Sequence, residues 1–565
     1  MEEQLVVLRA SAQRLTATPV EELPRIAHFL ASSVSSCKIA LQASSNKSSE
    51  NTLPVHKLKT RLSSLLHDKT VSGRFTAAVV IKAYVETASP HGPEWESWLR
   101  TLIGCLNKPD PWKVKKVFLS TIVRILLLCQ HSPQLQREVS TPHLPAFITA
   151  TLTIIRPSSR QSGSKTRTTT SPLLPSVFHC WSELLQYYGN TIRPFVSRIK
   201  PICLSVLSES GQASSLQDLA AQVLASLCRC SPKNAVQGEW DSAFRLLIKT
   251  AHDTLDLVFR GVREDRAPAD LASSRPSIRH NYSQPPLTET HDPAGLLPWK
   301  GIRDGTQRVI NLFRWMEKMV HCSSQPATVP IGELVDLLTR VFSVIIPDVK
   351  KYLPRLNAEV GKEEREELWS SLPELHVAGL RFSTSLTLVF GQVLFSTFST
   401  LSNQVLDLFL AEKWHANIRL QSYVFWTTLI QTSPFACTQV DRQTFNNLCK
   451  SCCLDLGGLI SQQDQNQQAN DNALRTTAAT AGSKSSQTSS LSLDSNQRRQ
   501  RSRSALSQAA EELLATLLEQ TPATVFSAQA RTELDRTAIL LNDQRALYAS
   551  VLNPPATRPA SPSKH

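Results

Sequence analysis

Glycine is scarce in this chain, with 18 in 565 residues. So little glycine argues against the Gly-rich nucleotide-binding folds and against β architectures that need many tight turns. Proline is plentiful by contrast: its 33 copies fall mostly between apolar runs. Because proline interrupts helices and stiffens connectors, this pattern predicts short helices joined by rigid turns.

Catalytic signatures are also missing from the sequence. There is no nucleophile elbow and no His-Glu-x-x-His pair, and Gly163–Thr166 lacks the first glycine of a phosphate loop. The paired carboxylates of Glu363–Glu367 sit in a run typical of a solvated helix face. We therefore predict no enzyme activity and no cofactor, with a concealed catalytic constellation as the alternative.

The 12 cysteines are scattered through apolar runs and do not form a dense framework. Such cysteines behave as small buried hydrophobes, and the pattern favours a reducing compartment. Cys449, Cys452 and Cys453 include a CxxC spacing, but a zinc site needs four ligands and no second pair or nearby histidine follows. The sequence predicts helical core cysteines and no metal.

No segment reads clearly as a targeting or membrane segment. The N-terminus lacks a basic region followed by an apolar core, so we expect no signal peptide. The stretch Phe382–Leu406 is uncharged, but Ser, Thr, Asn and Gln interrupt it, and a lipid-spanning helix would have to bury them. We expect a buried, Ser/Thr-rich core helix there.

Helical periodicity dominates what is present. One long helix is predicted over Trp112–Cys129, and its inward residues are expected to be Val114, Val117, Phe118, Thr121, Ile122 and Ile125. Successive helices with short connectors predict an all-α, HEAT- or armadillo-like α-solenoid with disordered linkers and a C-terminal low-complexity region. A compact, irregular helical domain is the alternative.

The predicted organisation has seven parts: helical repeats at 1–210, continuing repeats at 211–265, a disordered linker at 266–300, a second helical-repeat region at 301–456, a basic low-complexity linker at 457–504, short helices at 505–552 and a disordered tail at 553–565. The region 301–456 should have Trp315, Trp369, Trp414 and Trp426 in its core.

The stretch Leu65–Thr87, LLHDKTVSGRFTAAVVIKAYVET, shows how the helices should pack. From Thr76 to Ala83 its residues are small or β-branched on most faces, with Lys82 as the one charge. An inner helix of a two-layer stack is contacted on both sides, and small residues let neighbouring backbones approach. We therefore expect an inner helix with Lys82 reaching an edge, and severe destabilisation by Ala78→Arg.

Four blocks in order carry a family resemblance: PVEELPRIAHFLASS (19–33), KLKTRLSSLLHDKTVSGRFTAAVVIKAYVE (57–86), KPDPWKVKKVFLSTIVRIL (108–126) and STPHLPAFITATL (140–152). Together they resemble the N-terminal domain of the fungal Rix-type pre-rRNA-processing proteins. The animal counterpart is the proline-, glutamate- and leucine-rich nuclear scaffold. The resemblance covers about residues 5–207. The C-terminal tail departs from the animal family, because it is Gln/Ser-rich and basic instead of acidic.

The resemblance implies a non-catalytic scaffold in the nucleus, in both nucleolus and nucleoplasm. Its implied partners are a WD-repeat propeller subunit, a small helical-repeat subunit, a midasin-type AAA ATPase and the pre-60S particle, with two scaffold copies per complex. The implied process is 60S subunit biogenesis, including processing of the second internal transcribed spacer and late pre-60S remodelling. An importin- or exportin-like carrier is the alternative, although such solenoids are usually acidic and longer.

The net charge of +14 favours anionic partners such as RNA, or simply a solvated basic surface. Two sets of residues concentrate this charge. The candidate nuclear localisation cluster is Arg498, Arg499, Arg501 and Arg503, which import receptors could read or which could merely aid solubility. The candidate RNA- or anion-contacting patch is Lys108, Lys113, Lys115 and Lys116, with Arg160, Lys165 and Arg167 from a loop. A solvated helix face is the alternative there, and no aromatic residue is expected to interleave as a stacking platform.

Overall fold

The computed structural model describes residues 2–43, 49–88, 94–155, 171–232, 235–264, 282, 284–288, 292–322, 329–347, 355–391, 395–458 and 491–554. These residues form helices and connecting turns, with two isolated β-bridges, Val262 with Leu356 and Leu287 with Lys300. The all-α prediction is confirmed. The chain divides into two compact units, Met1–Trp240 (unit 1) and Asp241–His565 (unit 2).

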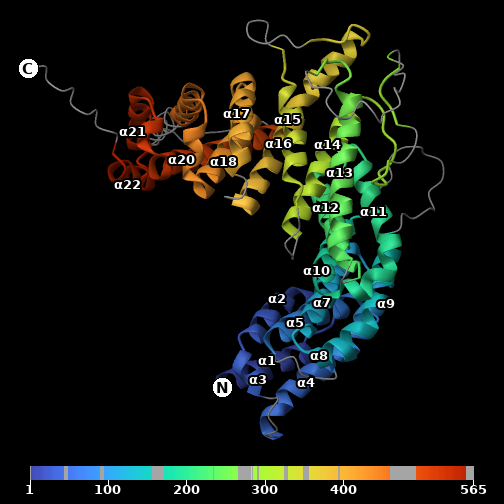
Figure 1. Ribbon diagram of the computed structural model, residues 1–565. Helices are drawn as coiled ribbons and strands as arrows, with labels where there is room; N and C mark the ends of the chain where they lie inside the picture. The colour runs from blue at the N-terminus through green and yellow to red at the C-terminus, as the bar shows by residue number, and fades with distance from the viewer. Residues whose placement is uncertain are drawn as a thin grey trace, which may run out of the picture. The chain divides into compact units, whose positions relative to one another are not determined.

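Unit 1 is a stack of helices in two layers (Figure 1). In the first layer α2, α5, α7, α10 and α12 each pack on the next, and in the second α1, α4, α6 and α9 do so. This alternation is the arrangement of a helical-repeat solenoid. The elements are α1 (Glu2–Ala17), α2 (Leu23–Ser35), α3 (Lys38–Ala43), α4 (Ser49–Leu66), α5 (Val71–Thr87), α6 (Glu94–Leu106), α7 (Trp112–Cys129), α8 (Pro133–Leu135), η1 (Gln136–Ser140), α9 (Thr141–Ile154), α10 (Leu174–Ile192), η2 (Arg193–Phe195), α11 (Val196–Ser208), α12 (Ser214–Leu227) and η3 (Cys228–Cys230).

Unit 2 repeats the two-layer plan. Helices α14, α16, α18, α20 and α22 pack in sequence as one layer, and α15 packs on α17 in the other. The elements are α13 (Val236–Val258), which begins in unit 1, α14 (Ile302–Cys322), α15 (Ile331–Ser343), α16 (Lys362–Phe390), α17 (Phe395–Glu412), α18 (Ala416–Thr432), η5 (Pro434–Gln439), a helix over residues 442–458, α20 (Leu491–Gln520), η6 (Ala523–Val525), α21 (Ala528–Leu541) and α22 (Gln544–Leu552).

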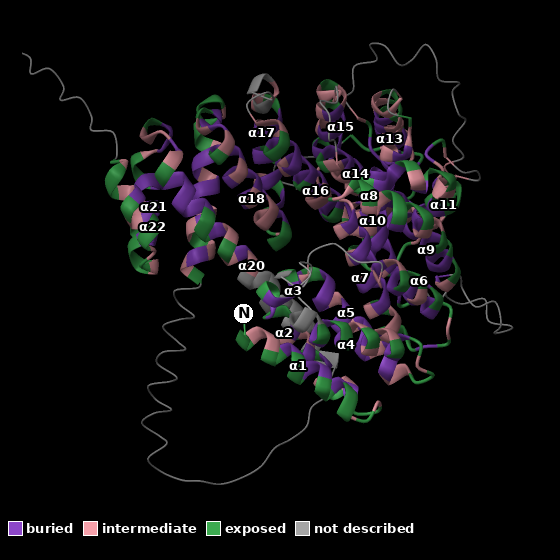
Figure 2. Cartoon of the chain, turned by 90° about the horizontal axis from the view of Figure 1, so that it is seen from below, coloured by how far each residue is buried: buried purple, intermediate pink, exposed green. Residues whose placement is uncertain are grey.

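In both units the buried residues lie on the sides of the helices that face other helices. Figure 2 shows buried residues where helices meet and exposed residues on their outer sides. Helix α5 is the clearest case, since it packs on α2, α4 and α7 and buries Thr76, Ala77, Ala78, Val80, Ile81 and Ala83. Lys82 is half-buried and its Nζ donates to Ser120 Oγ of α7 at 2.9 Å. The predicted inner helix, with its lysine at an edge, is confirmed.

The uncharged stretch Phe382–Leu406 differs from the single core helix predicted for it. Helix α16 ends at Phe390, Gly391 adopts a positive φ of 43°, and α17 starts at Phe395. The polar residues of α16 are nevertheless buried as expected: Ser383 Oγ and Thr387 Oγ1 each donate to the carbonyl four residues earlier, at 2.9 Å. None of the described helices combines the length and the apolar character needed to cross a bilayer.

Part of the predicted linker 266–300 is packed structure instead. Residues 292–300 pack within unit 2, where Ala294, Leu296 and Trp299 are buried. Buried Arg308 of α14 donates to the Leu297 carbonyl at 2.6 Å and pairs with Asp292. This segment, which we call the strap (residues 292–300), has no helical periodicity, so its composition resembles that of a linker. Residues 265–281, 283 and 289–291 lie outside the described residues.

Two boundaries and the exposure of one tryptophan differ from the predictions. The compact-unit boundary falls at Trp240, because α12 packs on α10 and α11 and so extends unit 1 beyond residue 210. Helix α20 begins at Leu491 instead of Ala505, so its first turns occupy part of the predicted low-complexity segment. Of the four tryptophans predicted for the core of unit 2, Trp315 and Trp426 are buried, Trp369 is half-buried, and Trp414 is 63% exposed.

Candidate partner-binding groove

A groove in unit 1 runs over α7 between α5 and α10, which are its neighbours in the first layer. It encloses about 350 Å³. Lys82 and Glu86 line it from α5, Lys116 and Arg124 from α7, and His179, Cys180 and Glu183 from α10. We call it the α7 groove. Since consecutive helices of one layer build it, its shape follows from the repeat packing.

The charges of the α7 groove are mixed and partly paired. Arg124 Nε lies 3.0 Å from Glu86 Oε1, which ties α7 to α5. His179 Nε2 lies 3.5 Å from Glu183 Oε1 within α10. Lys116 is exposed and forms no ion pair with the described residues. The Lys116 ammonium is therefore free, whereas the charged groups beside it are already paired. A polar protein segment that carries an acidic group would fit this arrangement, because its carboxylate could pair with Lys116.

The chemistry of the α7 groove does not favour catalysis. Burial, with a smaller contribution from Glu183, raises the pKa of the Cys180 thiol to about 12. The thiol is therefore neutral at physiological pH and a poor nucleophile. Throughout the described ranges, no three His, Cys, Asp or Glu residues gather in a way that could hold a metal ion. Cys449 and Cys452 are buried in the helix over 442–458, where Cys452 Sγ donates to the Ala510 carbonyl at 3.2 Å.

The structure spreads the predicted lysine patch around the first turns of α7. At about 100° per residue, Lys116 lies about 60° around the helix from Lys113, whereas Lys115 lies about 160° from Lys113, so the three side chains do not all share one face. Lys116 lines the α7 groove, whereas Lys113 Nζ lies 5.8 Å from the Trp112 ring centroid. Lys108 is half-buried in the preceding turn, and Arg160, Lys165 and Arg167 lie outside the described residues.

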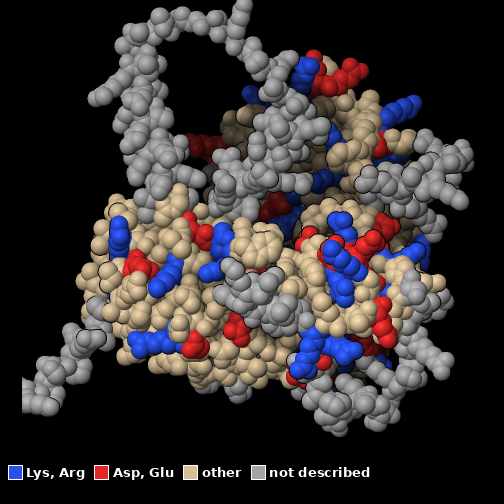
Figure 3. Space-filling model, turned by 90° about the horizontal axis from the view of Figure 1, so that it is seen from above, with Lys and Arg blue, Asp and Glu red and all other residues tan. Residues whose placement is uncertain are grey.

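An aromatic residue does interleave with the lysines, contrary to the sequence prediction. Trp112 is 46% exposed at the start of α7 and stacks with Lys113. An exposed indole beside ammonium groups is the combination that binds single-stranded nucleic acid. The face of the molecule in Figure 3 shows Lys and Arg interspersed with Asp and Glu over the described residues, so the basic charge there is not gathered into one field.

A buried ion pair holds the turn that presents these groups. Arg74 of α5 donates through Nη2 and Nε to Asp110 at 2.6 and 3.1 Å, and through Nη1 to the Asp68 and Lys69 carbonyls. Both ionic side chains are almost fully buried, so the pair fixes the turn Lys108–Pro111 onto α5. This pair is absent from the predictions made from the sequence. The signal was an arginine within an apolar helix and an aspartate between two prolines.

The predicted localisation cluster falls on the N-terminal part of α20, which spans Leu491–Gln520. The side chains of Arg498, Arg499, Arg501 and Arg503 lie outside the described residues. The cluster is therefore carried by a helical segment, and its role stays a prediction.

Comparison with known proteins identifies the first part of the chain. Residues 7–214 match the family model RIX1, described as rRNA processing/ribosome biogenesis. Residues 7–214, less than half of the chain, are therefore similar to the RIX1 family. The match confirms the resemblance carried by the four sequence blocks, and it contains α5, α7, α10 and the α7 groove. It supports a role in ribosome biogenesis.

Two curated relatives are both called proline-, glutamic acid- and leucine-rich protein 1. The Xenopus laevis protein is 21% identical over 325 residues, covering 53% of this chain and 28% of its own length. The Mus musculus protein is 25% identical over 252 residues, covering 44% of this chain and 20% of its own length. This chain thus spans less than a third of the length of either relative.

A solved structure resembles the whole chain. It is a chain of the Rix1 subcomplex from a Rix1-Rea1 pre-60S particle, with a TM-score of 0.60 and 11% identity, covering 98% of this chain and 99% of that one. At this identity the likeness establishes the fold. It therefore confirms the helical-repeat class for unit 2, which lies wholly beyond the RIX1 match.

Proposed function

We propose that this protein is a non-catalytic scaffold subunit of a nuclear complex in 60S ribosomal subunit biogenesis. The observation that carries the proposal is the RIX1 family match over residues 7–214. The likeness in fold to a chain of the Rix1 subcomplex supports it. The scaffold would act in processing of the second internal transcribed spacer and in late pre-60S remodelling. It would contribute by holding partner subunits in position on the ribosomal precursor.

The proposed partners are a WD-repeat propeller subunit, a small helical-repeat subunit, a midasin-type AAA ATPase and the pre-60S particle, with two copies of the scaffold. Helical repeats suit this role because each repeat adds surface while contacting only its neighbours. The α7 groove is the proposed partner surface in unit 1, since its three helices expose Lys116 beside paired charges.

Affinity purification of the full chain from nuclear extract, followed by mass spectrometry, tests this role. The scaffold proposal expects large-subunit precursors and a propeller protein. Recovery of a small GTPase with varied cargo, and no ribosomal precursor, would instead indicate a nuclear transport carrier. Native mass spectrometry of the recovered complex would give its stoichiometry.

The contribution of the α7 groove can be measured in the same purification. Lys116→Glu places a carboxylate beside Glu86 and Glu183, so it should reduce recovery of at least one protein partner while leaving the melting temperature unchanged. Lys69→Glu is the matched control, because Lys69 is exposed in unit 1 and does not line the groove. Equal recovery with both variants would exclude the groove as a partner surface.

We further propose that Trp112 and the lysines near it contact rRNA. Stacking by an exposed tryptophan contributes about 1–3 kcal/mol per base, and phosphate contacts make binding sensitive to salt. Trp112→Ala should therefore lower cross-linking of the protein to precursor rRNA in cells. Unaltered cross-linking with both Trp112→Ala and the Lys113/Lys115/Lys116→Ala variant would rule this surface out.

Nuclear import is proposed to depend on Arg498, Arg499, Arg501 and Arg503. Replacing all four with alanine should shift the fluorescent full-length protein toward the cytoplasm. Replacing Lys108, Lys113, Lys115 and Lys116 removes the same number of cations elsewhere and should leave the distribution unchanged. Full nuclear accumulation of the arginine variant would show that this cluster is not the sole signal.

A further inference from the structure

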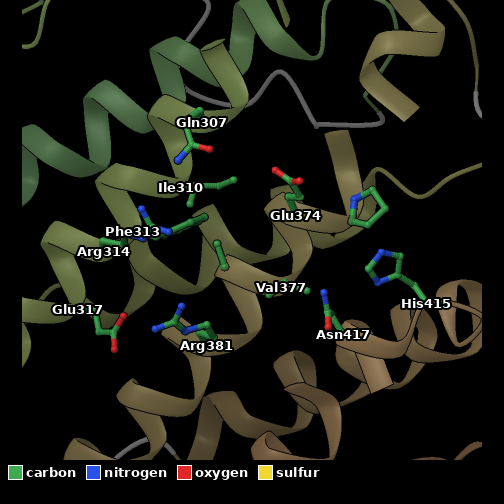
Figure 4. Close-up of a pocket in the computed structure, with 12 residues that line it drawn as sticks. Gln307, Ile310, Phe313, Arg314, Glu317, Glu374, Val377, Arg381, His415 and Asn417 are labelled. Carbon is green, nitrogen blue, oxygen red and sulfur yellow. The ribbon is translucent and has the colours of Figure 1, made fainter. Parts of the chain in front are cut away.

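A second groove lies in unit 2, on the layer formed by α14, α16 and α18. It encloses about 200 Å³ and is lined by Gln307, Ile310, Phe313, Arg314 and Glu317 of α14, Pro373, Glu374, Val377, Ala378 and Arg381 of α16, and His415 and Asn417 at the start of α18. We call it the α16 groove. Figure 4 shows these side chains converging on a shared space from the three helices.

The charges of the α16 groove are separated along α16. Arg381 lies at one end, near Arg314 and Glu317, and Glu374 lies toward the other end with His415 (Figure 4). Arg381 and Glu374 are both exposed, and neither forms an ion pair with any described residue. Glu317 is already engaged, since its Oε1 accepts from Ser385 Oγ at 3.1 Å. The groove is therefore left with a net positive end and a negative end.

An apolar floor separates the two ends. Phe313 and Ile310 are buried, and Val377 and Ala378 are half-buried between Glu374 and Arg381 on the same face of α16. A volume of about 200 Å³ is of the size that holds one large apolar side chain, because an engineered cavity of about 150 Å³ accommodates benzene. A whole helix would not fit into this space, but one anchoring side chain would.

Polar groups for a peptide backbone are also present. Asn417 is exposed at the groove, and its amide can donate and accept together. His415 Nδ1 is buried and has no hydrogen-bond partner among the described residues. Trp414, 63% exposed, lies edge-on to His415 with ring centroids 5.5 Å apart. A ligand with backbone amides could therefore hydrogen-bond to the exposed Asn417 amide.

The distance between Glu374 and Arg381 determines the spacing of charged residues in a ligand that would pair with both. Glu374 and Arg381 are seven residues apart on α16, which corresponds to about 10.5 Å along the axis. An extended peptide advances about 3.3 Å per residue, so this distance spans about three residues. We propose that the α16 groove binds an extended peptide segment of a partner protein. The segment carries an acidic side chain for Arg381 and a basic side chain for Glu374, about three positions apart, with a large apolar residue between them.

This inference deepens the proposed scaffold function by giving unit 2 a partner chemistry of its own. It can fail separately, because peptide binding is measured on the purified full chain and needs no ribosomal precursor. A random peptide library displayed on phage is selected against the full chain, and the affinities of the enriched peptides are measured by fluorescence anisotropy. We expect enriched peptides to share the acidic, apolar and basic pattern.

Charge reversal provides the decisive comparison. Arg381→Glu and Glu374→Arg should each weaken binding about tenfold or more, because each removes a charge-assisted contact and adds repulsion. The double variant should bind peptides in which the acidic and basic positions are exchanged. Lys362→Glu is the matched control: it reverses an exposed charge on α16 outside the groove and should change nothing.

Three results would overturn the proposal. One is the absence of any enriched peptide that discriminates wild type from Arg381→Glu. Another is failure of the double variant to accept exchanged peptides while its melting temperature equals that of wild type. The third is a change in sedimentation coefficient of the purified protein on charge reversal, which would assign the groove to a second copy of this chain. Since both altered residues are exposed, the variants should fold, and Arg381→Gln offers a milder test of the same contact.

Discussion

The two units share a two-layer helical plan but are held together differently. In unit 1 the first layer is closed mainly by small and branched side chains, as on α5, and a buried ion pair joins Arg74 of α5 to Asp110 of the turn before α7. Unit 2 buries several arginines: Arg260 pairs with Glu364, Arg308 with Asp292, and Arg340 with Asp256 and Glu264. Periodic apolar packing can be read from a sequence, whereas ion pairs between distant residues cannot.

The buried arginines of unit 2 serve mainly to attach non-helical segments. Arg260 donates to the Gln284 carbonyl at 2.6 Å, and Arg308 holds the strap through Leu297. His376 and Glu412 form another buried pair, with His376 Nδ1 2.9 Å from Glu412 Oε2 and Nε2 3.1 Å from the Val344 carbonyl. Buried polar contacts therefore hold the non-helical segments of unit 2 in place. In unit 1 such contacts serve chiefly to hold the turn Lys108–Pro111.

The largest effect is expected in unit 1 from Ala78→Arg. Ala78 is fully buried between α5 and its neighbours, and its carbonyl accepts from Thr121 Oγ1 at 3.1 Å. Burying an unpaired charge in this contact should cost more than about 5 kcal/mol and unfold the unit. Ala10→Arg, on the exposed side of α1, is the control and should be neutral. An unchanged melting temperature for Ala78→Arg would refute the inner-helix placement.

The next comparison sets Arg74→Ala against Arg340→Ala. Loss of Arg74 leaves Asp110 buried with its side chain 2% exposed, so the free energy of unfolding should fall by about 3–5 kcal/mol. The carboxylates left by Arg340 are 34% and 17% exposed, so water screens them and the loss should be about 2–3 kcal/mol. Hydrogen exchange on the full chain, resolved by unit, measures both. A larger effect for Arg340→Ala would reverse this ranking.

Alanine substitution of one buried glycine in each unit should give smaller losses of stability. A Cβ on Gly189 would lie 2.5 Å from the Arg229 carbonyl oxygen, and one on Gly305 would lie 2.5 Å from the Trp299 ring. Backbone yields less readily than a side chain, so Gly189→Ala should destabilise more than Gly305→Ala within a range of about 1–3 kcal/mol. Equal losses measured by thermal unfolding would mean that the strap carrying Trp299 is as rigid as the backbone of unit 1.

The smallest expected effect is a gain in stability. Gly104 of α6 is exposed, and an added Cβ would meet nothing within 4 Å. Gly104→Ala should therefore stabilise unit 1 by about 0.5–1 kcal/mol, because alanine restricts the unfolded chain and favours the helix. A loss of stability would indicate that a partner or another segment covers this face.

Much of unit 1 could be predicted from periodicity. The expected helix over Trp112–Cys129 has those bounds in α7. Of its predicted inward residues, Phe118, Thr121, Ile122 and Ile125 are buried, whereas Val114 and Val117 are half-buried. The predicted inner helix at α5 is also confirmed. Both cases succeed because apolar spacing reports directly on which side of a helix is covered.

The parts that could not be predicted depend on contacts distant in sequence or on single backbone positions. The strap has no periodicity, so only its burial against α14 separates it from a linker. Gly391 divides an uncharged stretch through one positive φ, and Trp414 is exposed between Lys413 and His415. Of the candidate site, the lysines were found by composition, but the α7 groove and the Arg74–Asp110 pair required the packing of α5 on α7.

Sedimentation of the tagged full-length protein from nuclear extract through a gradient tests the central proposal most directly. If the chain is a scaffold of 60S biogenesis, it should migrate with large-subunit precursors that retain the second internal transcribed spacer. The Lys116→Glu variant should be depleted from those fractions. A protein found only in light fractions, with no precursor rRNA in the same peak, would contradict the account.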